Sequence, residues 1–334
     1  MWRRDAQRTA VSAERLPDEL HLQWVRHYPP LKPAFRSKRL QFDGGYEPVA
    51  LGNRLFVGSS RNDSITALDI STGEELWRFF TEGPVRFAPV AWRGKVYAGS
   101  DDGHLYCLDA ESGALRWKFK AVPSNRKVVG NDRLISLWPL RGGSVRADGR
   151  IYFAAGVWPF EGVFVYALDA ETGAVVWMND RAGFLYGAQP HNARAMGGLT
   201  PQGYLLINGD DLLVPCGTAM PAVFDRHTGK LKGFELTPKG RDPGGWFASI
   251  GVISSAEAKA RRRGELLVDA DINRDLHEDT WYQGPGKPAV RSTVSIGGRP
   301  YSFLDEIPGA TDGPSDYRHR REFRQSERAR AGPR

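Results

Sequence analysis

The stretch GHLYCLDAESGALRWKF, residues 103–119, decides the fold class. An alternating apolar run ends at Asp109, a short turn containing Gly113 follows, and a second run closes on Trp117. This pattern predicts two antiparallel strands joined by a tight turn. The aspartate can accept hydrogen bonds from the N–H groups of the turn, and the glycine can adopt a positive φ. The tryptophan is large enough to pack one small sheet against the next.

The same pattern recurs along the chain. Three copies place Asp four residues before Gly and eight before Trp: Asp69/Gly73/Trp77, Asp109/Gly113/Trp117 and Asp169/Gly173/Trp177. A fourth copy keeps Asp225 and Gly229 but has Gly233 where the tryptophan should stand. Another short strand is predicted before each copy, starting at Arg54, Lys95, Arg150 and Asp211. A single small sheet cannot bury both of its faces, so such units must stack in a line or around a ring.

The spacing of the repeats favours a ring. The first two aspartates are 40 residues apart, the period of a propeller blade with four strands, and the later gaps of 60 and 56 residues hold insertions. Residues 263–304 read as a plausible fifth blade. We therefore expect an all-β fold, a β-propeller of four-stranded antiparallel blades over residues 45–305, with about five blades present. The three motif tryptophans should be buried at equivalent positions between blades.

The two ends differ in composition from the propeller. Residues 1–44 are expected to form an N-terminal segment that could supply a ring-closing strand, and residues 306–334 a disordered basic tail. The net charge of +7 is mostly terminal: residues 315–334 hold seven arginines against three acids. Because no motif for base readout accompanies this charge, nucleic-acid binding is not expected. The chain shows no signal-peptide pattern and no apolar run long enough to span a membrane.

The repeated phrase resembles the pyrroloquinoline-quinone-type β-propeller repeat over about residues 2–305. Quinoprotein alcohol dehydrogenases carry this repeat, and so does the non-enzymatic lipoprotein of the outer-membrane protein assembly machinery. The resemblance implies a bacterial protein that is exported or periplasmic at full length. It also implies a complete ring of seven or eight blades, so this chain should hold an incomplete one.

The resemblance also defines what a dehydrogenase of this family needs. Its quinone lies in the central funnel on a tryptophan floor, beneath a disulfide between adjacent cysteines, with Ca²⁺ held by Glu, Asn and Asp. This chain has two cysteines, Cys107 and Cys216, which are 109 residues apart within strand patterns. We expect two buried free thiols, and we expect no cofactor, in particular no pyrroloquinoline quinone.

Calcium has only weak support in the sequence. Asp269, Asp271, Asn273 and Asp275 alternate as in an EF-hand loop, but Arg274 replaces its glycine and Thr280 its bidentate glutamate. Solvated acids along a strand explain the run more simply, so no metal site is predicted.

Two classes of function stay open. The favoured one is a non-catalytic interaction or scaffold module, part of a longer exported bacterial protein, which binds protein partners or a small anionic ligand. The alternative is a fragment of a quinone- or calcium-dependent oxidoreductase.

Aligning the blades gives a candidate site. The segments PVRFAPV and PLRGGSV place Arg86 and Arg141 at equivalent positions, just before the strand that starts a blade at the axis. Inter-blade segments add His191, Arg194 and Trp246. Arginine and aromatic side chains converging on a channel mouth would suit an anionic or planar ligand. Alternatively, the arginines pair with carbonyls or acids between blades.

Overall fold

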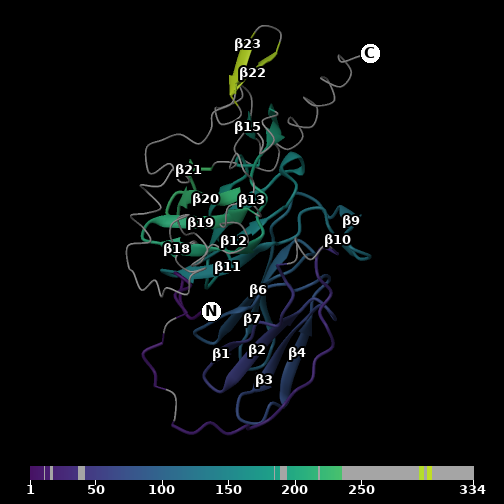
Figure 1. Cartoon of the computed structure of the whole chain (residues 1–334), viewed down its shortest axis with the longest axis vertical. Coiled ribbons are helices and arrows are strands. Elements are labelled where there is room, and N and C mark those ends of the chain that lie inside the picture. Colours follow the sequence, from purple (N-terminus) through teal and green to yellow (C-terminus); the bar gives the residue numbers. More distant parts are fainter. Residues whose placement is uncertain are drawn as a thin grey trace, which may run out of the picture.

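The computed structural model describes residues 1–10, 12–15, 18–36, 42–183, 185–188, 194–216, 219–234, 293–296 and 299–302. Within these residues, four antiparallel blades of four strands each follow one another along the chain, and a fifth strand joins the sheet of the third blade (Figure 1). Blade 1 consists of β1 (Val49–Leu51), β2 (Arg54–Ser59), β3 (Ser64–Asp69) and β4 (Glu75–Phe80). Blade 2 consists of β5 (Val90–Trp92), β6 (Lys95–Gly99), β7 (His104–Asp109) and β8 (Leu115–Lys120). Blade 3 consists of β11 (Gly142–Ala147), β12 (Arg150–Ala155), β13 (Phe164–Asp169) and β14 (Val175–Asn179). Blade 4 consists of β18 (Leu206–Asn208), β19 (Asp211–Cys216), β20 (Ala219–Asp225) and β21 (Leu231–Gly233).

The predicted all-β fold with four-stranded antiparallel blades is confirmed. Each blade pairs its strands in chain order, and the predicted starts at Arg54, Lys95, Arg150 and Asp211 begin β2, β6, β12 and β19. The first strands of the blades, β1, β5, β11 and β18, contact one another and form the inner side. Every blade carries a register shift at the same place between its last two strands. Such a bulge increases the local twist.

The insertions form small elements between the blades. Between blades 2 and 3 lies the hairpin β9 (Lys127–Val129) and β10 (Leu134–Ser136), and within blade 3 lies the 3₁₀ turn η1 (Pro159–Glu161). Between blades 3 and 4 lie β15 (Leu185–Ala188), β16 (Arg194–Gly197) and β17 (Gly203–Tyr204), of which β17 pairs in parallel with β11. Of the predicted fifth blade, the structure describes the hairpin β22 (Thr293–Ile296) and β23 (Arg299–Ser302). The acidic run 269–279 and the tail 306–334 lie outside the described residues.

The repeat aspartates and glycines have the predicted geometry. In blade 2, Asp109 Oδ1 accepts hydrogen bonds from the backbone N–H groups of Glu111 and Ser112 at 3.0 and 2.8 Å, and Gly113 has a φ of +74°. Asp69, Asp169 and Asp225 make the same pair of bonds. Gly73, Gly173 and Gly229 have φ values of +73°, +75° and +72°.

The repeat tryptophans link each blade to the next one. Nε1–H of Trp77, Trp117 and Trp177 donates to a backbone carbonyl in the following blade's turn, at 3.2, 3.1 and 2.9 Å. Each indole also covers the repeat glycine of that turn. The predicted equivalence is therefore confirmed. The prediction of burial is correct only for Trp177, since the other two rings are half-buried at the outer rim.

Blade 1 receives its tryptophan from outside the repeats. Trp24 lies against Gly73 and donates from Nε1 to the carbonyl of Ile70 at 3.0 Å. The described parts of residues 1–44 contain no strand. Residues 18–36 instead form an irregular segment, in which Trp24 lies on the outside of blade 1, at the place that a preceding blade would fill, and Ala34 is buried beside Asp43.

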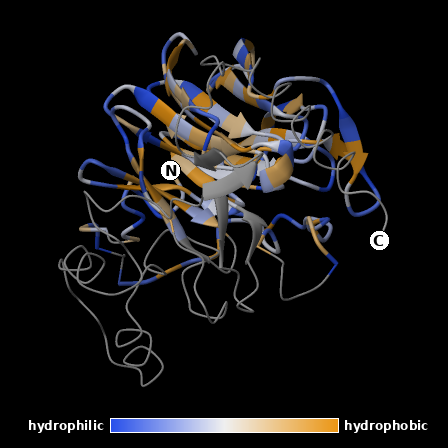
Figure 2. Ribbon diagram, turned by 90° about the horizontal axis from the view of Figure 1, so that it is seen from above, coloured by the Kyte–Doolittle hydropathy of each residue, from blue (hydrophilic) through white to orange (hydrophobic). Residues whose placement is uncertain are grey.

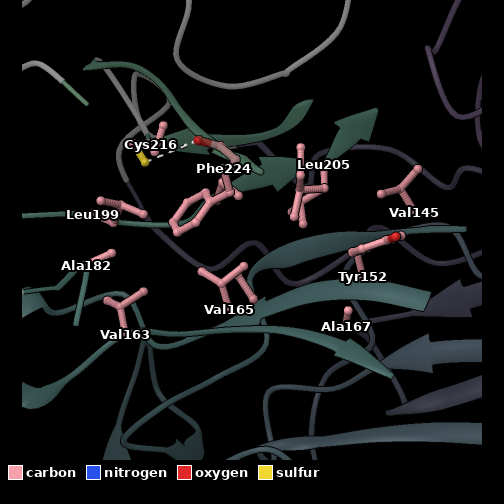
Figure 3. Packing of buried hydrophobic residues seen from close by; sticks show 14 of the residues in the cluster. Val145, Tyr152, Val163, Val165, Ala167, Ala182, Leu199, Leu205, Cys216 and Phe224 are labelled. Carbon is pink, nitrogen blue, oxygen red and sulfur yellow. Dashed lines mark hydrogen bonds between the residues drawn. The ribbon is translucent and has the colours of Figure 1, made fainter. Parts of the chain in front are cut away.

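Three apolar clusters lie between neighbouring blades. The cluster shared by blades 3 and 4 includes Tyr152, Val165, Leu205 and Phe224, all fully buried (Figure 3). The other two join blade 1 to blade 2 and blade 2 to blade 3. Figure 2 shows the hydrophobic residues concentrated in the packed sheets. The core is thus distributed between blades, and the inner strands are left to line the axis.

Candidate functional site

The two arginines that the blade alignment singled out meet on one carboxylate. Arg86 Nε donates to Asp101 Oδ2 at 2.5 Å, and Arg141 donates from Nε and a terminal nitrogen to the two oxygens of Asp101, both at 3.1 Å. Arg86 precedes β5 and Arg141 immediately precedes β11, so both project from the same end of the inner strands. Asp101 follows β6. The predicted proximity of the two guanidinium groups is therefore observed.

A second acid completes the group. A terminal nitrogen of Arg86 lies 2.6 Å from Asp43 Oδ2, and Asp43 also accepts from the backbone N–H of Ala34. All four charged side chains are at most 3% exposed. Burial by itself raises the pKa of Asp101, but the charges of Arg141 and Arg86 outweigh it and hold that pKa below its ordinary value.

This cluster is electrically balanced within the chain. Two guanidinium groups face two carboxylates, and the guanidinium of Arg141 also stacks on the rings of Phe35 and Phe42. Such pairing is the arrangement that a buried ion network requires. It favours the interpretation that these arginines hold the blades together. The binding of an anion at Arg86 and Arg141 stays a prediction.

The remaining predicted site residues contribute no described side chain. His191 and Trp246 lie outside the described residues. Arg194 begins β16, and only its backbone is described.

The centre of the described blades holds a group that the sequence analysis missed. Arg8 is fully buried between blades 3 and 4 and donates to the carbonyls of Leu205, Trp2 and Ser144 at 3.0, 2.9 and 2.8 Å. The ring of Trp2 stacks on Tyr204 with the centroids 4.0 Å apart. Residues 1–10 therefore fill the space between the inner strands, and the N-terminal residues lie among the blades in Figure 1.

Tyr204 connects this central segment to blades 1 and 2. Its hydroxyl donates to the carboxylate of Glu47, just before β1, and accepts from the backbone N–H of Ala88, just before β5. Burial raises the pKa of Glu47 to about 7, although the hydrogen bond from Tyr204 and the charge of Arg8 act in the opposite direction. Only the Arg-x-x-x-Arg-Thr pattern at the N-terminus offered a sequence signal for this group, and nothing in it indicated which partners Arg8 would find.

The two cysteines are separate buried thiols, as predicted. Cys107 lies in β7 of blade 2 and Cys216 at the end of β19 in blade 4, and both are free. Burial raises the pKa of each thiol to about 12. Within the described part of the chain, no group of three or more His, Cys, Asp or Glu side chains could hold a metal ion, and no helix is long and apolar enough to cross a membrane.

Comparison with known proteins finds one family model that matches the first part of the chain. Residues 1–137 match the family model described as outer membrane protein assembly factor BamB. The dehydrogenase subunit of the quinone alcohol dehydrogenase of Gluconobacter oxydans is 31% identical over 137 residues, which cover 37% of this chain and 18% of that protein. BamB of Alkalilimnicola ehrlichii is 33% identical over 157 residues, covering 42% of this chain and 34% of that protein. The chain thus spans less than a fifth of this alcohol dehydrogenase and about a third of this BamB.

Solved structures of the same two kinds match a little over half of this chain. BamB from Moraxella catarrhalis is 20% identical, with a TM-score of 0.40 over 56% of this chain and 51% of that one. The quinohemoprotein alcohol dehydrogenase ADHIIG from Pseudomonas putida is 17% identical, with a TM-score of 0.44 over 58% of this chain and 34% of that one. Together with the repeats and the four-stranded blades, the sequence matches lead to one assignment: the chain contains a PQQ-like β-propeller repeat domain related to BamB and to the quinoprotein alcohol dehydrogenases.

Proposed function

We propose that this protein is a non-catalytic β-propeller, an interaction or scaffold module within a longer exported bacterial polypeptide. The observation that carries the proposal is the occupied centre of the described blades. Arg8 is fully buried there, and three of its nitrogens donate to backbone carbonyls of the chain itself. Trp2 and Tyr204 stack beside it. A cofactor entering between these inner strands would have to displace side chains that are already packed and hydrogen-bonded.

The buried arginines and the two thiols, which are the groups that could bind a ligand or react, support the same proposal. The charges of Arg86 and Arg141 are balanced by Asp43 and Asp101. The thiols of Cys107 and Cys216 sit in different blades, and their raised pKa keeps them protonated at neutral pH. These residues stabilise the propeller and offer neither a nucleophile nor a general base.

The alternative, an oxidoreductase function, is tested because part of the chain is similar in sequence to quinone alcohol dehydrogenases. The experiment adds pyrroloquinoline quinone and Ca²⁺ to the full chain and follows quinone uptake by absorbance and alcohol-dependent reduction of a dye. We expect neither signal above that of heat-unfolded protein. Stoichiometric uptake with alcohol-dependent turnover would replace the scaffold function with an oxidoreductase function.

A second measurement tests the scaffold role directly. The chain is exported from a bacterial host behind a signal peptide, cross-linked in cells and purified through a tag. We expect one protein to be captured in stoichiometric amount, with cross-links to the blades. An exported, folded chain that captures no stoichiometric partner would contradict the proposed role.

A further inference from the structure

A second arginine pair lies at the opposite end of the inner strands. Arg141 stands just before β11, and Arg146 lies close to the far end of the same strand. The neighbour of Arg146 in blade 2 is Trp92, the last residue of β5. The guanidinium carbon of Arg146 is 3.7 Å from the centroid of the Trp92 ring, and that of Arg93 is 4.8 Å from it. Two guanidinium groups from neighbouring blades thus meet on one indole.

These two arginines lack the carboxylates that balance Arg86 and Arg141. Among the described residues, neither guanidinium forms a hydrogen bond or an ion pair, and the buried Nε of Arg146 has no hydrogen-bond partner. Asp148, the acid that follows closely on Arg146, is engaged elsewhere: one of its oxygens lies 2.5 Å from a terminal nitrogen of Arg226. Burial, and then the charge of Arg93, lower the pKa of Arg146. The charge of Asp148 acts in the opposite direction but is outweighed. At this end of the inner strands, therefore, no carboxylate in direct contact balances the two guanidinium groups.

The backbone at Arg93 gives independent evidence. Arg93 opens the two-residue turn between β5 and β6 with a φ of +43°, a left-handed conformation that side chains other than Asn, Asp or Gly rarely adopt. In the equivalent turns of the other blades this place is held by Gly52, Asp148 and Gly209, with φ values of +59°, +46° and +55°. Blade 2 alone among the four described blades places an arginine there, at a conformational cost that the turn does not require. Backbone strain of this kind is typical of functional positions.

We propose that Arg93 and Arg146, beside Trp92, form an oxyanion-binding site that takes the carboxylate or phosphate group of a small ligand. Guanidinium groups donate paired hydrogen bonds to such groups, and the indole holds the Arg146 fork in place by stacking. An entering anion would supply the acceptor that the buried Nε of Arg146 lacks and would offset the repulsion between the two cations. This proposal does not depend on the proposed scaffold function, because it is argued from Arg93, Arg146 and Trp92 and from none of the contacts of Arg8.

The site can be tested by calorimetric titration of the full chain at low ionic strength. The probes are inorganic phosphate and succinate, which separate a preference for phosphate from one for carboxylate. Arg93→Gly removes one guanidinium and installs the residue found at two equivalent turns, and Arg146→Gln removes the other. Arg61→Gln is the matched control, since Arg61 is an exposed arginine in the turn between β2 and β3 of blade 1.

We expect the wild type to bind at least one probe, and each site variant to weaken that binding by roughly tenfold or more, as for the loss of a charge-assisted hydrogen bond. Arg61→Gln should bind as the wild type does. Arg93→Gly should retain the thermal unfolding midpoint of the wild type, because glycine suits the turn, and this separates loss of binding from loss of fold. The proposal is overturned if the wild type binds neither probe, or if Arg61→Gln weakens binding as much as the site variants do.

Discussion

The repeat glycines serve two purposes at once. Gly113 needs a positive φ of +74°, and a Cβ placed on it would lie 2.6 Å from Cδ2 of Trp77. Gly173 and Gly229 stand in the same relation to Trp117 and Trp177. The glycine therefore lets the turn close and also lets the preceding blade's indole lie flat on it. This explains why the Asp/Gly/Trp register is kept as a unit.

We expect Gly113→Ala to destabilise the protein by about 3 kcal/mol or more, because the methyl group adds a steric clash to the strained φ. Gly149 provides the matched control, since its φ is also +74° and a methyl group on it would meet no atom within 4 Å. Gly149→Ala should cost only the conformational term, about 1–2 kcal/mol. Denaturant unfolding of both variants gives the difference. Equal losses would show that the contact with Trp77 is unimportant.

Asp101 is the residue on which the two axial arginines depend. Replacing it with asparagine keeps its shape but leaves Arg86 and Arg141 short of a negative charge in a buried site. We expect Asp101→Asn to lower the free energy of unfolding by about 3–5 kcal/mol. Asp132, whose ion pair with Arg36 is about three-quarters exposed, is the control, and Asp132→Asn should change stability by less than about 1 kcal/mol. Similar values for the two variants would contradict the structural role of the cluster.

Among the strands and connecting segments, residues 18–36 give blade 1 the tryptophan contact that each later blade receives from the blade before it. Trp24 lies on Gly73 as the repeat tryptophans lie on the other glycines, although its segment forms no strand. Leu22 and Val25 nearby are 81% and 61% exposed. Trp24 shares the anchoring of this segment to blade 1 with Arg26, whose guanidinium donates to the carbonyl of Gly73 at 3.0 Å and to the carboxylate of Glu75 at 2.9 Å.

Trp24→Ala should loosen the part of this segment that lies against blade 1. Because the ring is half-buried, we expect a loss of about 2 kcal/mol, together with faster proteolysis within residues 18–36. Leu22→Ala, in the same segment but with an exposed side chain, should leave both the unfolding midpoint and the cleavage rate unchanged. An unaltered cleavage rate in Trp24→Ala would mean that other contacts hold the segment.

For the propeller as a whole, the buried Glu47 beside the central segment should make stability depend on pH. The pKa of Glu47 is about 7 in the folded protein, above its ordinary value of 4.5. Between these two values the unfolded chain has released this proton while the folded protein retains it, so the contribution of Glu47 to stability falls as pH rises and levels off above about pH 7.

The variant Glu47→Gln should lack this term. We expect the free energy of unfolding of the wild type to fall by about 2 kcal/mol relative to that of the variant between about pH 5 and pH 8. Denaturant titrations of both proteins across this range measure the difference, and groups common to both cancel. A difference that stays constant with pH would show that Glu47 titrates normally.

The repeats alone were sufficient to predict blades, strand starts and turn chemistry, because these depend on residues close together in the chain. The spacing from Asp109 to Trp117 specifies a hairpin that closes locally, and the same spacing elsewhere specifies its neighbours. Burial of the tryptophans was predicted less well. Spacing says which blade an indole reaches, but the exposure of Trp77 and Trp117 depends on how far out along the blade the contact lies.

The partners of the charged side chains near the axis could not be predicted from the repeat spacing. The blade alignment brought Arg86 and Arg141 together, because equivalent positions in a ring face one axis. The carboxylate that both of them bind, Asp101, belongs to no repeat signature and becomes their partner only when blades 2 and 3 pack. In the same way, Arg8 reaches the carbonyls of Ser144 and Leu205, 136 and 197 residues away. Local sequence therefore determines each blade, whereas the charge balance at the axis is set by contacts between distant segments, which exist only once the blades are assembled.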